Sequence, residues 1–211
     1  MTGAAPDGYR GLIVDFGGVL STSFEGALRS FCVREGLAPN ALEQVFSLDA
    51  GAKGMLVDLE RGAVGQAEFV PHLADALGVN PDGLLERMAA DLRLEPEVTN
   101  KIECLRRRGV QVAVLSNSWG SHPFDPYEPF NLHERFDAVV ISDRLGLRKP
   151  DPEIFLLAAE RLALPASACV FVDDVARYLP PAQRLGMGIV HATDPATTIA
   201  KLAQVFPSAT A

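Results

Sequence analysis

Carboxylate side chains follow two apolar runs of the sequence, and they are the residues best suited to chemistry. Asp15 comes directly after the run Gly11-Leu-Ile-Val14, and Asp173 and Asp174 follow Cys169-Val-Phe-Val172. Three carboxylates brought together would repel one another strongly unless a cation lay between them. Oxygen ligands of this kind suit Mg²⁺, which keeps several of its waters when it binds to proteins. The sequence therefore predicts a magnesium site built on these three side chains.

Groups that could bind a phosphoryl ester lie beside other apolar runs. Ser116 and Asn117 follow Val110-Gln-Val-Ala-Val-Leu115, and Lys149 stands just before a proline. A hydroxyl, backbone N–H groups and an ammonium around a metal would neutralise the charge of a phosphoryl group. A carboxylate beside the phosphorus can attack it and form an aspartyl-phosphate. This set of residue types indicates phosphoryl transfer.

Strand-like runs alternate with helical patterns after Pro96, and this alternation predicts the scaffold that positions the polar residues. Such a pattern is typical of an α/β fold, a Rossmann-like core with a mostly parallel sheet covered by helices on both faces. Ligands bind such sheets at the carboxyl ends of the strands, so we expect the polar residues to meet in one crevice. The predicted strands are 11–14, 110–115, 136–141, 169–172 and 188–191, and the predicted helices are 98–108, one opening at Asp151-Pro152, 176–185 and one after Asp194.

The segment between the first two predicted strands has a different texture. Apolar residues recur there at helical spacing, as in Ala27-Leu28-Phe31-Cys32 and Phe69-Leu73-Ala76-Leu77, with glycine and proline between the repeats. Few β-branched residues occur in it. We therefore expect a small all-helical cap domain, residues 23–98, inserted into a core domain made of residues 1–22 and 99–211.

Charge and composition exclude several classes of partner. The net charge is −8 and the pI is near 5.0, which disfavours nucleic acid and anionic membranes because both need clustered cations. No apolar run approaches membrane-spanning length, and residues 1–8 lack the features of a signal peptide. The three cysteines are odd in number and widely separated, so we expect a cytoplasmic protein with buried, reduced thiols and no disulfide framework. We also expect a monomer or a homodimer.

Four stretches, taken in order, are similar to the four motifs of the haloacid dehalogenase superfamily. They cover nearly the whole chain, and the helical insertion resembles the small type-one cap of that family. The resemblance implies a Rossmann-like core and a Mg²⁺-dependent phosphatase. The stretches are Asp15-Phe-Gly-Gly-Val-Leu20, Val114-Leu-Ser-Asn117, Ser142 to Pro152 and Phe171-Val-Asp-Asp174.

The resemblance also implies roles for individual residues. Asp15 would be the nucleophile and Lys149 would hold the nucleophile and the phosphoryl group together. Ser116 would bind phosphate oxygens, with the backbone of Gly18 and Asn117 nearby. Asp174 would be the main metal ligand, Asp173 would bind directly or through water, and Asp15 and the Gly17 carbonyl would complete the set.

Gly17 departs from the family pattern. Most phosphatases of the family carry a second aspartate there, which protonates the leaving oxygen and later activates water. General acid–base help of this kind contributes about 10²–10⁴-fold. A phosphatase-like branch of the family, which resembles sugar phosphatases, carries glycine at this position, so one interpretation is a phosphatase with a substitute acid or substrate assistance. A second is a weakly active or non-catalytic relative that binds a phospho-ligand or protein. A third is other chemistry, such as dehalogenation or a phosphomutase reaction. Glu25 and His122 lie near the motifs, and we assign the acid role to neither.

A small cap favours a compact substrate. It can close over the crevice and exclude water, and it would obstruct a folded phosphoprotein. We therefore expect a small phosphorylated metabolite, with a sugar phosphate as one candidate. The aromatic and proline-rich loop 119–130 either contacts substrate or packs against the cap or another subunit.

Overall fold

One parallel sheet organises the computed structural model, which describes residues 8–207. Its strand order is β3-β2-β1-β4-β5, and every neighbouring pair is parallel. The order reverses at β1 and β4, the topological switch point at which α/β sheets bind ligands. The α/β, Rossmann-like prediction is confirmed. The strands are β1 Gly11–Val14, β2 Gln111–Ser116, β3 Ala138–Ile141, β4 Cys169–Asp173 and β5 Gly188–His191.

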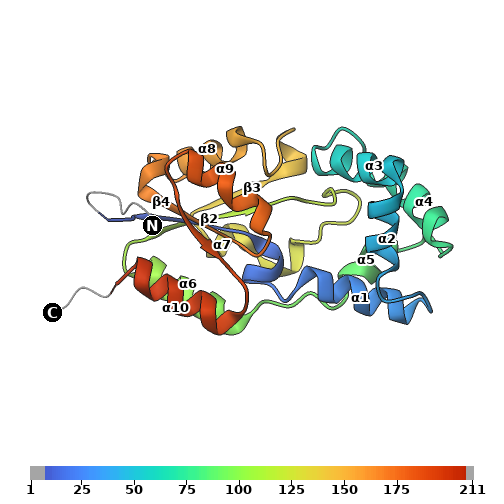
Figure 1. Ribbon diagram of the computed structural model, residues 1–211, viewed down its shortest axis with the longest axis horizontal. Helices are drawn as coiled ribbons and strands as arrows, with labels where there is room; N and C mark the ends of the chain where they lie inside the picture. Colours follow the sequence, from blue (N-terminus) through green and yellow to red (C-terminus); the bar gives the residue numbers. More distant parts are fainter. Residues whose placement is uncertain (1–7, 208–211) are drawn as a thin grey trace.

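Helices cover both faces of this sheet (Figure 1). α8 (Pro152–Arg161) and α9 (Leu179–Arg184) lie on one face, and α6 (Pro96–Arg107) and α10 (Pro195–Val205) lie on the other. Successive strand side chains point to opposite faces, so each strand contributes to two apolar cores. Leu12 packs with the α6 and α10 side, whereas Ile13 packs with the α8 and α9 side, and both are fully buried.

Two elements begin later than the sequence predicts. The helix expected over 176–185 is a short turn, Ala176–Tyr178, followed by α9, because Pro180 and Pro181 lack N–H donors and suit only a first helical turn. The strand expected from Phe136 begins at Ala138, after the short helix α7 (Leu132–Arg135), because the Phe136 N–H still closes that helix by donating to the Leu132 carbonyl.

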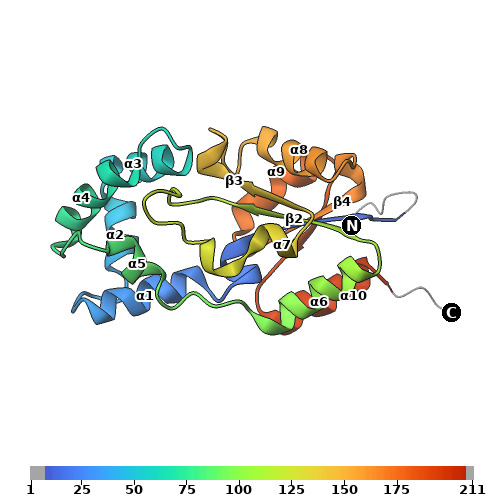
Figure 2. The same cartoon turned by 180° about the vertical axis from the view of Figure 1, so that it is seen from behind.

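Five helices between β1 and α6 form a separate lobe (Figures 1 and 2). They share an apolar cluster of their own, which includes the buried Phe31, Leu59 and Phe69. The sequence patterns singled out four of these helices and passed over the glycine-containing α3. The helices are α1 Phe24–Arg34, α2 Ala41–Leu48, α3 Ala50–Glu60, α4 Gln66–Leu77 and α5 Leu84–Ala89.

The chain crosses between the two lobes twice, and the crossings lie side by side. The Thr22 N–H donates to the Arg93 carbonyl and the Glu95 N–H donates to the Leu20 carbonyl, both at 2.8 Å. Val98 of α6 already packs in the same core cluster as Leu12. We therefore propose that the core resumes at Pro96, slightly before the predicted boundary at residue 99.

The remaining expectations concern membrane-spanning helices, the three cysteines and the N-terminal residues. Within residues 8–207, no helix combines the length and the apolar character needed to cross a bilayer. Cys32 and Cys169 are buried free thiols as expected, but Cys104 is exposed, so the expectation of buried thiols is wrong for that residue. Residues 1–7 carry most of the sequence features that argue against a signal peptide, and they lie outside the described part of the chain.

Candidate active site

The three predicted acidic residues meet where β1 and β4 end. Val14 is in register with Val172, and the Asp15 N–H donates to the Val172 carbonyl at 2.9 Å. This pairing brings Asp15 beside Asp173 and Asp174. One oxygen from each of the three carboxylates lies within 4.8 Å of the others, so the group could hold a metal ion.

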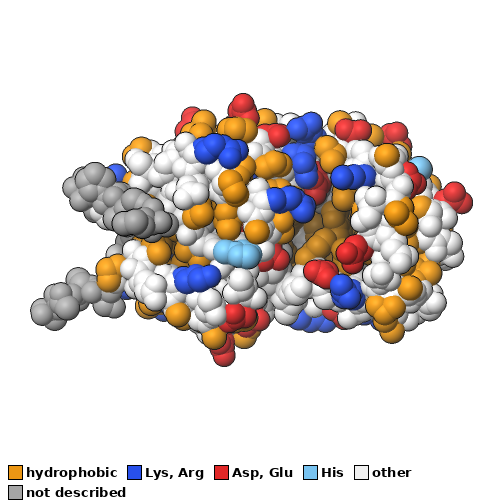
Figure 3. All heavy atoms as spheres, viewed as in Figure 1, with side chains coloured by type: hydrophobic (Ala, Val, Ile, Leu, Met, Phe, Trp, Pro, Cys, Tyr) orange, Lys and Arg blue, Asp and Glu red, His pale blue; other side chains and the backbone are white. Residues whose placement is uncertain are grey.

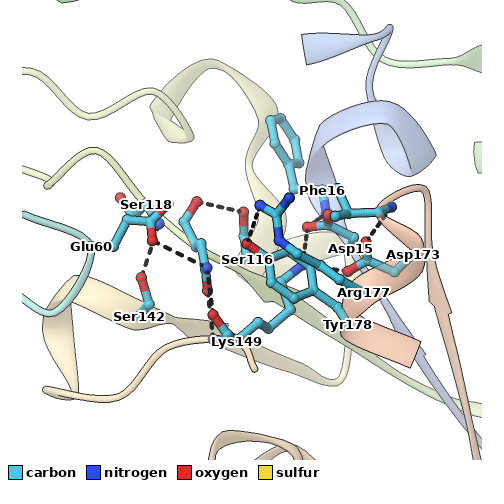
Figure 4. Close-up of polar contacts among 12 residues, drawn as sticks. Asp15, Phe16, Glu60, Ser116, Ser118, Ser142, Lys149, Asp173, Arg177 and Tyr178 are labelled. Atoms are coloured by element: carbon cyan, nitrogen blue, oxygen red, sulfur yellow. Dashed lines mark hydrogen bonds and ion pairs between the residues drawn. The ribbon is translucent and has the colours of Figure 1, made fainter. Parts of the chain in front are cut away.

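Lys149 lies among these acids. Its side chain is 1% exposed, and its Nζ lies 2.9 Å from Asp15 Oδ1 and 2.6 Å from Asp173 Oδ2 (Figure 4). The Asn117 side chain holds the backbone at this position. Asn117 Oδ1 accepts from the Lys149 N–H at 2.8 Å, and its Nδ2 donates to the Lys149 carbonyl at 3.1 Å. Asn117 therefore fixes the loop that delivers the ammonium, a role the sequence did not suggest for its side chain.

One ammonium faces three carboxylates, and the charges do not balance. Burial raises the pKa of Asp15 to about 8; Lys149 opposes this shift and Asp173 adds to it. Burial and Asp173 also raise the pKa of Asp174. Burial lowers the pKa of Lys149, but Asp15 and Asp173 raise it by a larger amount. The net shift is upward, so the ammonium keeps its proton. A divalent cation would supply the missing positive charge.

The donor chemistry of the site fits Mg²⁺. Its side-chain donors are carboxylate oxygens, which hard cations prefer. Lys149 Nζ and the Phe16 N–H, at 2.7 Å, both contact Asp15 at Oδ1. Both contacts engage the same carboxylate oxygen of Asp15. The half-buried Asp174 lines the cavity in front of Asp15, whereas Asp173 is fully buried behind it.

Gly17 and Gly18 differ in what surrounds them. Gly18 has φ +72°, and a Cβ at this position would overlap the carboxylate of Asp174. Glycine is therefore required there for both backbone conformation and space. Gly17 has φ −69° and ψ 127°, which any residue adopts, and a Cβ there would lie 3.4 Å from Phe24 Cβ, an ordinary contact. The site requires glycine at position 18, whereas position 17 has room for a side chain.

Ser116 is oriented by a residue that the sequence placed only in an aromatic loop. The buried Tyr127 hydroxyl donates to Ser116 Oγ at 2.9 Å. Burial raises the pKa of Tyr127, so its hydroxyl keeps its proton. Ser116 Oγ accepts this bond and donates its own proton to the Asn117 carbonyl at 3.4 Å, a long contact that a ligand oxygen could replace. The ring of Tyr127 packs edge-on against Phe16 at 5.1 Å between centroids, which fixes the hydroxyl in place.

The helical lobe contributes Glu60 to the same region. Glu60 is the last residue of α3, and its Oε2 lies 2.5 Å from Arg148 Nε and 3.4 Å from Asn117 Nδ2. Burial raises the pKa of Glu60 while Arg148 lowers it. A second ion pair joins Arg61 to Asp151 at 2.9 Å. Both pairs tie the end of α3 to the loop that carries Lys149.

A cavity of about 310 Å³ lies between the lobes, with its apolar floor visible in Figure 3. Of the predicted site residues, Asp15, Gly17, Ser116, Asn117, Lys149 and Asp174 line it, while Asp173 and Gly18 lie directly behind. Sequence reasoning missed the lining residues Glu60, Arg177 and Tyr178, since nothing in their local sequence marks them. Of the two substitute acids considered, Glu25 lines the cavity, whereas His122 is exposed and is not among the lining residues.

The two glycines give a matched pair of variants. Gly18→Ala should lose most of the rise in melting temperature that Mg²⁺ produces, because its Cβ would displace Asp174. Gly17→Ala should keep that rise, because only the backbone carbonyl of residue 17 is a predicted ligand. Thermal unfolding with and without Mg²⁺ measures both. Equal responses of the two variants would contradict this view of Asp174.

The bond between Tyr127 and Ser116 can be tested by a double-mutant cycle. Tyr127→Phe should cost about 0.5–1.5 kcal/mol in the free energy of unfolding, because one buried hydrogen bond is lost while the ring is kept. It should also weaken inhibition by inorganic phosphate. In the Ser116→Ala background the same substitution should have a much smaller effect, and full additivity would show that the two hydroxyls act independently.

Comparison with known proteins places this site in a family. Residues 9–186 match the haloacid dehalogenase-like hydrolases. The chain is 27% identical over 202 residues to mouse acyl-CoA dehydrogenase family member 10, covering 92% of this chain and 19% of that protein. It is 34% identical over 126 residues to phosphatase MT3486 of Mycobacterium tuberculosis, covering 57% of this chain and 58% of that one. The chain thus spans less than two thirds of either curated relative.

A solved structure adds the bound ligands of a related enzyme. A HAD family enzyme from Bacteroides thetaiotaomicron, in complex with magnesium and inorganic phosphate, superposes with a TM-score of 0.66 at 25% identity, covering 89% of this chain and 96% of that chain. The family match spans most of the described residues, and the four motif stretches meet around one cavity. The chain therefore belongs to the haloacid dehalogenase-like hydrolases.

Proposed function

We propose that this protein is a phosphatase that hydrolyses small phosphate monoesters with Mg²⁺ through an aspartyl-phosphate at Asp15. The observation that carries the proposal is the Lys149 ammonium, held between Asp15 and Asp173 at the edge of a small cavity. Bound Mg²⁺ would neutralise the phosphoryl oxygens and the acidic cluster. Asp15, Asp174, the Gly17 carbonyl and, directly or through water, Asp173 would hold it.

The reaction then divides into two displacements. A carboxylate oxygen of Asp15 attacks phosphorus, the bond from phosphorus to the ester oxygen breaks, and that oxygen takes a proton from solvent water to leave as an alcohol. Water next attacks the phosphorus of the aspartyl-phosphate and gives its proton to solvent, which releases inorganic phosphate and restores the carboxylate. Lys149 stays charged throughout and keeps Asp15 beside the phosphoryl group. The Ser116 hydroxyl donates a hydrogen bond to a phosphoryl oxygen.

The substrate of the proposed reaction is a compact phosphorylated metabolite, because the cavity is small and the cap helices α1 and α3 contribute to its lining. A sugar phosphate is one member of this class. Nucleic acid and membrane surfaces stay outside the proposal, since the chain carries a net charge of −8. The monomeric or homodimeric state and the cytoplasmic location remain predictions.

A second candidate function is binding of a phospho-ligand with little or no turnover. Gly17 supplies no acid, and the two carboxylates that the helical lobe contributes to the cavity lining are engaged by arginines. Glu25 pairs with Arg29 at 2.7 Å and Glu60 pairs with Arg148 at 2.5 Å. A protein of this kind would keep the phosphate site and lose the proton donor.

Asp15→Asn should abolish Mg²⁺-dependent hydrolysis while leaving the fold intact, because the amide cannot act as the nucleophile. The assay measures phosphate release from an aryl ester and from an alkyl ester, with and without Mg²⁺, beside thermal unfolding of the variant. Persistent Mg²⁺-dependent turnover in Asp15→Asn would remove Asp15 as the nucleophile. If the wild-type protein hydrolysed neither ester, the result would favour the binding function.

Gly17→Asp should raise the turnover of alkyl phosphates, because position 17 has room for a side chain and the added carboxyl can protonate a basic leaving oxygen. The gain should reach about tenfold or more for alkyl esters and be much smaller for aryl esters. Gly17→Asn, which fits the same space without an acid, is the matched control. A gain of the same size for both esters, or in Gly17→Asn, would contradict the missing-acid explanation.

A further inference from the structure

We propose that the phosphate ester bound here carries a compact apolar group, best an aromatic ring, rather than a polyhydroxylated sugar. The inference rests on the proposed function and specifies its substrate class. It comes from the apolar part of the cavity lining, together with the missing acid at position 17.

This apolar wall comes from three parts of the chain. Phe24 and Leu28 lie one turn apart on α1 and both line the cavity. Leu92 comes from the segment after α5, and Trp119 and Pro126 come from the loop after β2. The Phe24 and Trp119 rings pack with their centroids 4.3 Å apart. These contacts join the helical lobe to the core loop in one continuous apolar surface.

The polar side chains of the same cavity, apart from the motif residues, already have partners. Glu60 is held by Arg148, and Glu25, whose side chain is 73% exposed, pairs with Arg29. Arg177 donates to Tyr178 Oη at 3.2 Å and lies over that ring. A site that selects a sugar needs several convergent donors and acceptors for its hydroxyls. Hydroxyls that faced Phe24, Leu28 and Leu92 would have no polar partner on that part of the lining, whereas a ring would be buried favourably there.

The chemistry of the leaving group points in the same direction. A phenol has a pKa of about 10, like the tyrosine side chain. A phenolate therefore departs without prior protonation far more readily than an aliphatic alkoxide. Gly17 leaves the site without the usual acid, and an aryl ester is the substrate that needs this acid least. A volume of about 310 Å³ lies at the lower end of ligand cavities and fits one ring beside a phosphoryl group.

The test compares esters whose leaving groups are both primary alkoxides. Benzyl phosphate and glucose 6-phosphate both release a primary alcohol, so their ratio of kcat/KM reports on the organic group alone. We expect benzyl phosphate to exceed glucose 6-phosphate by about tenfold or more, because the ring buries apolar area that the sugar does not. Phenyl phosphate should have a higher kcat than benzyl phosphate, because a phenolate departs more readily than an alkoxide. Equal or higher kcat/KM for glucose 6-phosphate would overturn the proposal while leaving the phosphatase function intact.

Variants locate the effect in the wall. Leu28→Gln should raise KM for benzyl phosphate by about tenfold and leave glucose 6-phosphate unchanged or improved. Leu48→Gln, at a leucine that is 85% exposed and outside the cavity, is the control and should change neither. An equal loss for both esters in Leu28→Gln would count against the proposal.

A binding measurement on the wild-type protein separates this proposal from the proposed function. With Mg²⁺ present, benzylphosphonate should bind about tenfold or more tightly than methylphosphonate, measured by calorimetry. This pair gives an answer even if no ester is hydrolysed, in which case the phosphatase function fails and the apolar subsite stands. Equal affinities for the two phosphonates would overturn the subsite.

Discussion

The ammonium of Lys149 is the charge on which the acidic site depends. It lies within 2.9 Å of Asp15 and 2.6 Å of Asp173, and all three side chains are almost completely buried. Without this cation, the ends of β1 and β4 would bring carboxylates together in a region from which water is largely excluded, at a high electrostatic cost. Asn117, through both atoms of its amide, and the adjacent strands hold the three groups in register. One ammonium does not balance the three carboxylates Asp15, Asp173 and Asp174, so a divalent cation would supply the rest of the positive charge.

Much of this arrangement could be predicted from the sequence because it follows from the geometry of parallel strands. Short apolar runs ending in Asp15, Ser116 and Asp173 place these residues at one edge of the sheet, whatever the details of the helices. The order of the stretches and their resemblance to a known family supplied the roles. At α9 the observed helix begins later than predicted. Its start is set by two consecutive prolines and the turn before them, and a prediction from apolar periodicity takes account of neither.

The rest of the site depends on contacts between distant parts of the chain, which no local pattern specifies. Glu60 and Arg148 are 88 residues apart and meet only because α3 folds back over the loop before α8. Tyr127 reaches Ser116 because its ring packs on Phe16, and aromatic composition alone could not assign that partner. The difference between Gly17 and Gly18 is likewise invisible in sequence. It is set by a positive φ at one residue and by the position of the Asp174 carboxylate.

The paired crossings between the lobes also determine how the cavity can be reached. Leu20 to Thr22 and Arg93 to Glu95 are hydrogen-bonded to each other, and they leave the core on the side of α6 and α10. On the opposite side, next to α8, the end of α3 is tied down by the Glu60–Arg148 and Arg61–Asp151 pairs. Movement of the lobe about the crossings would have to break these two ion pairs and the hydrogen bonds from the Gln66 side chain to the Trp119 and Phe124 carbonyls. Admission of a larger ligand would cost these contacts, so charge pairing as well as packing stabilises the closed arrangement.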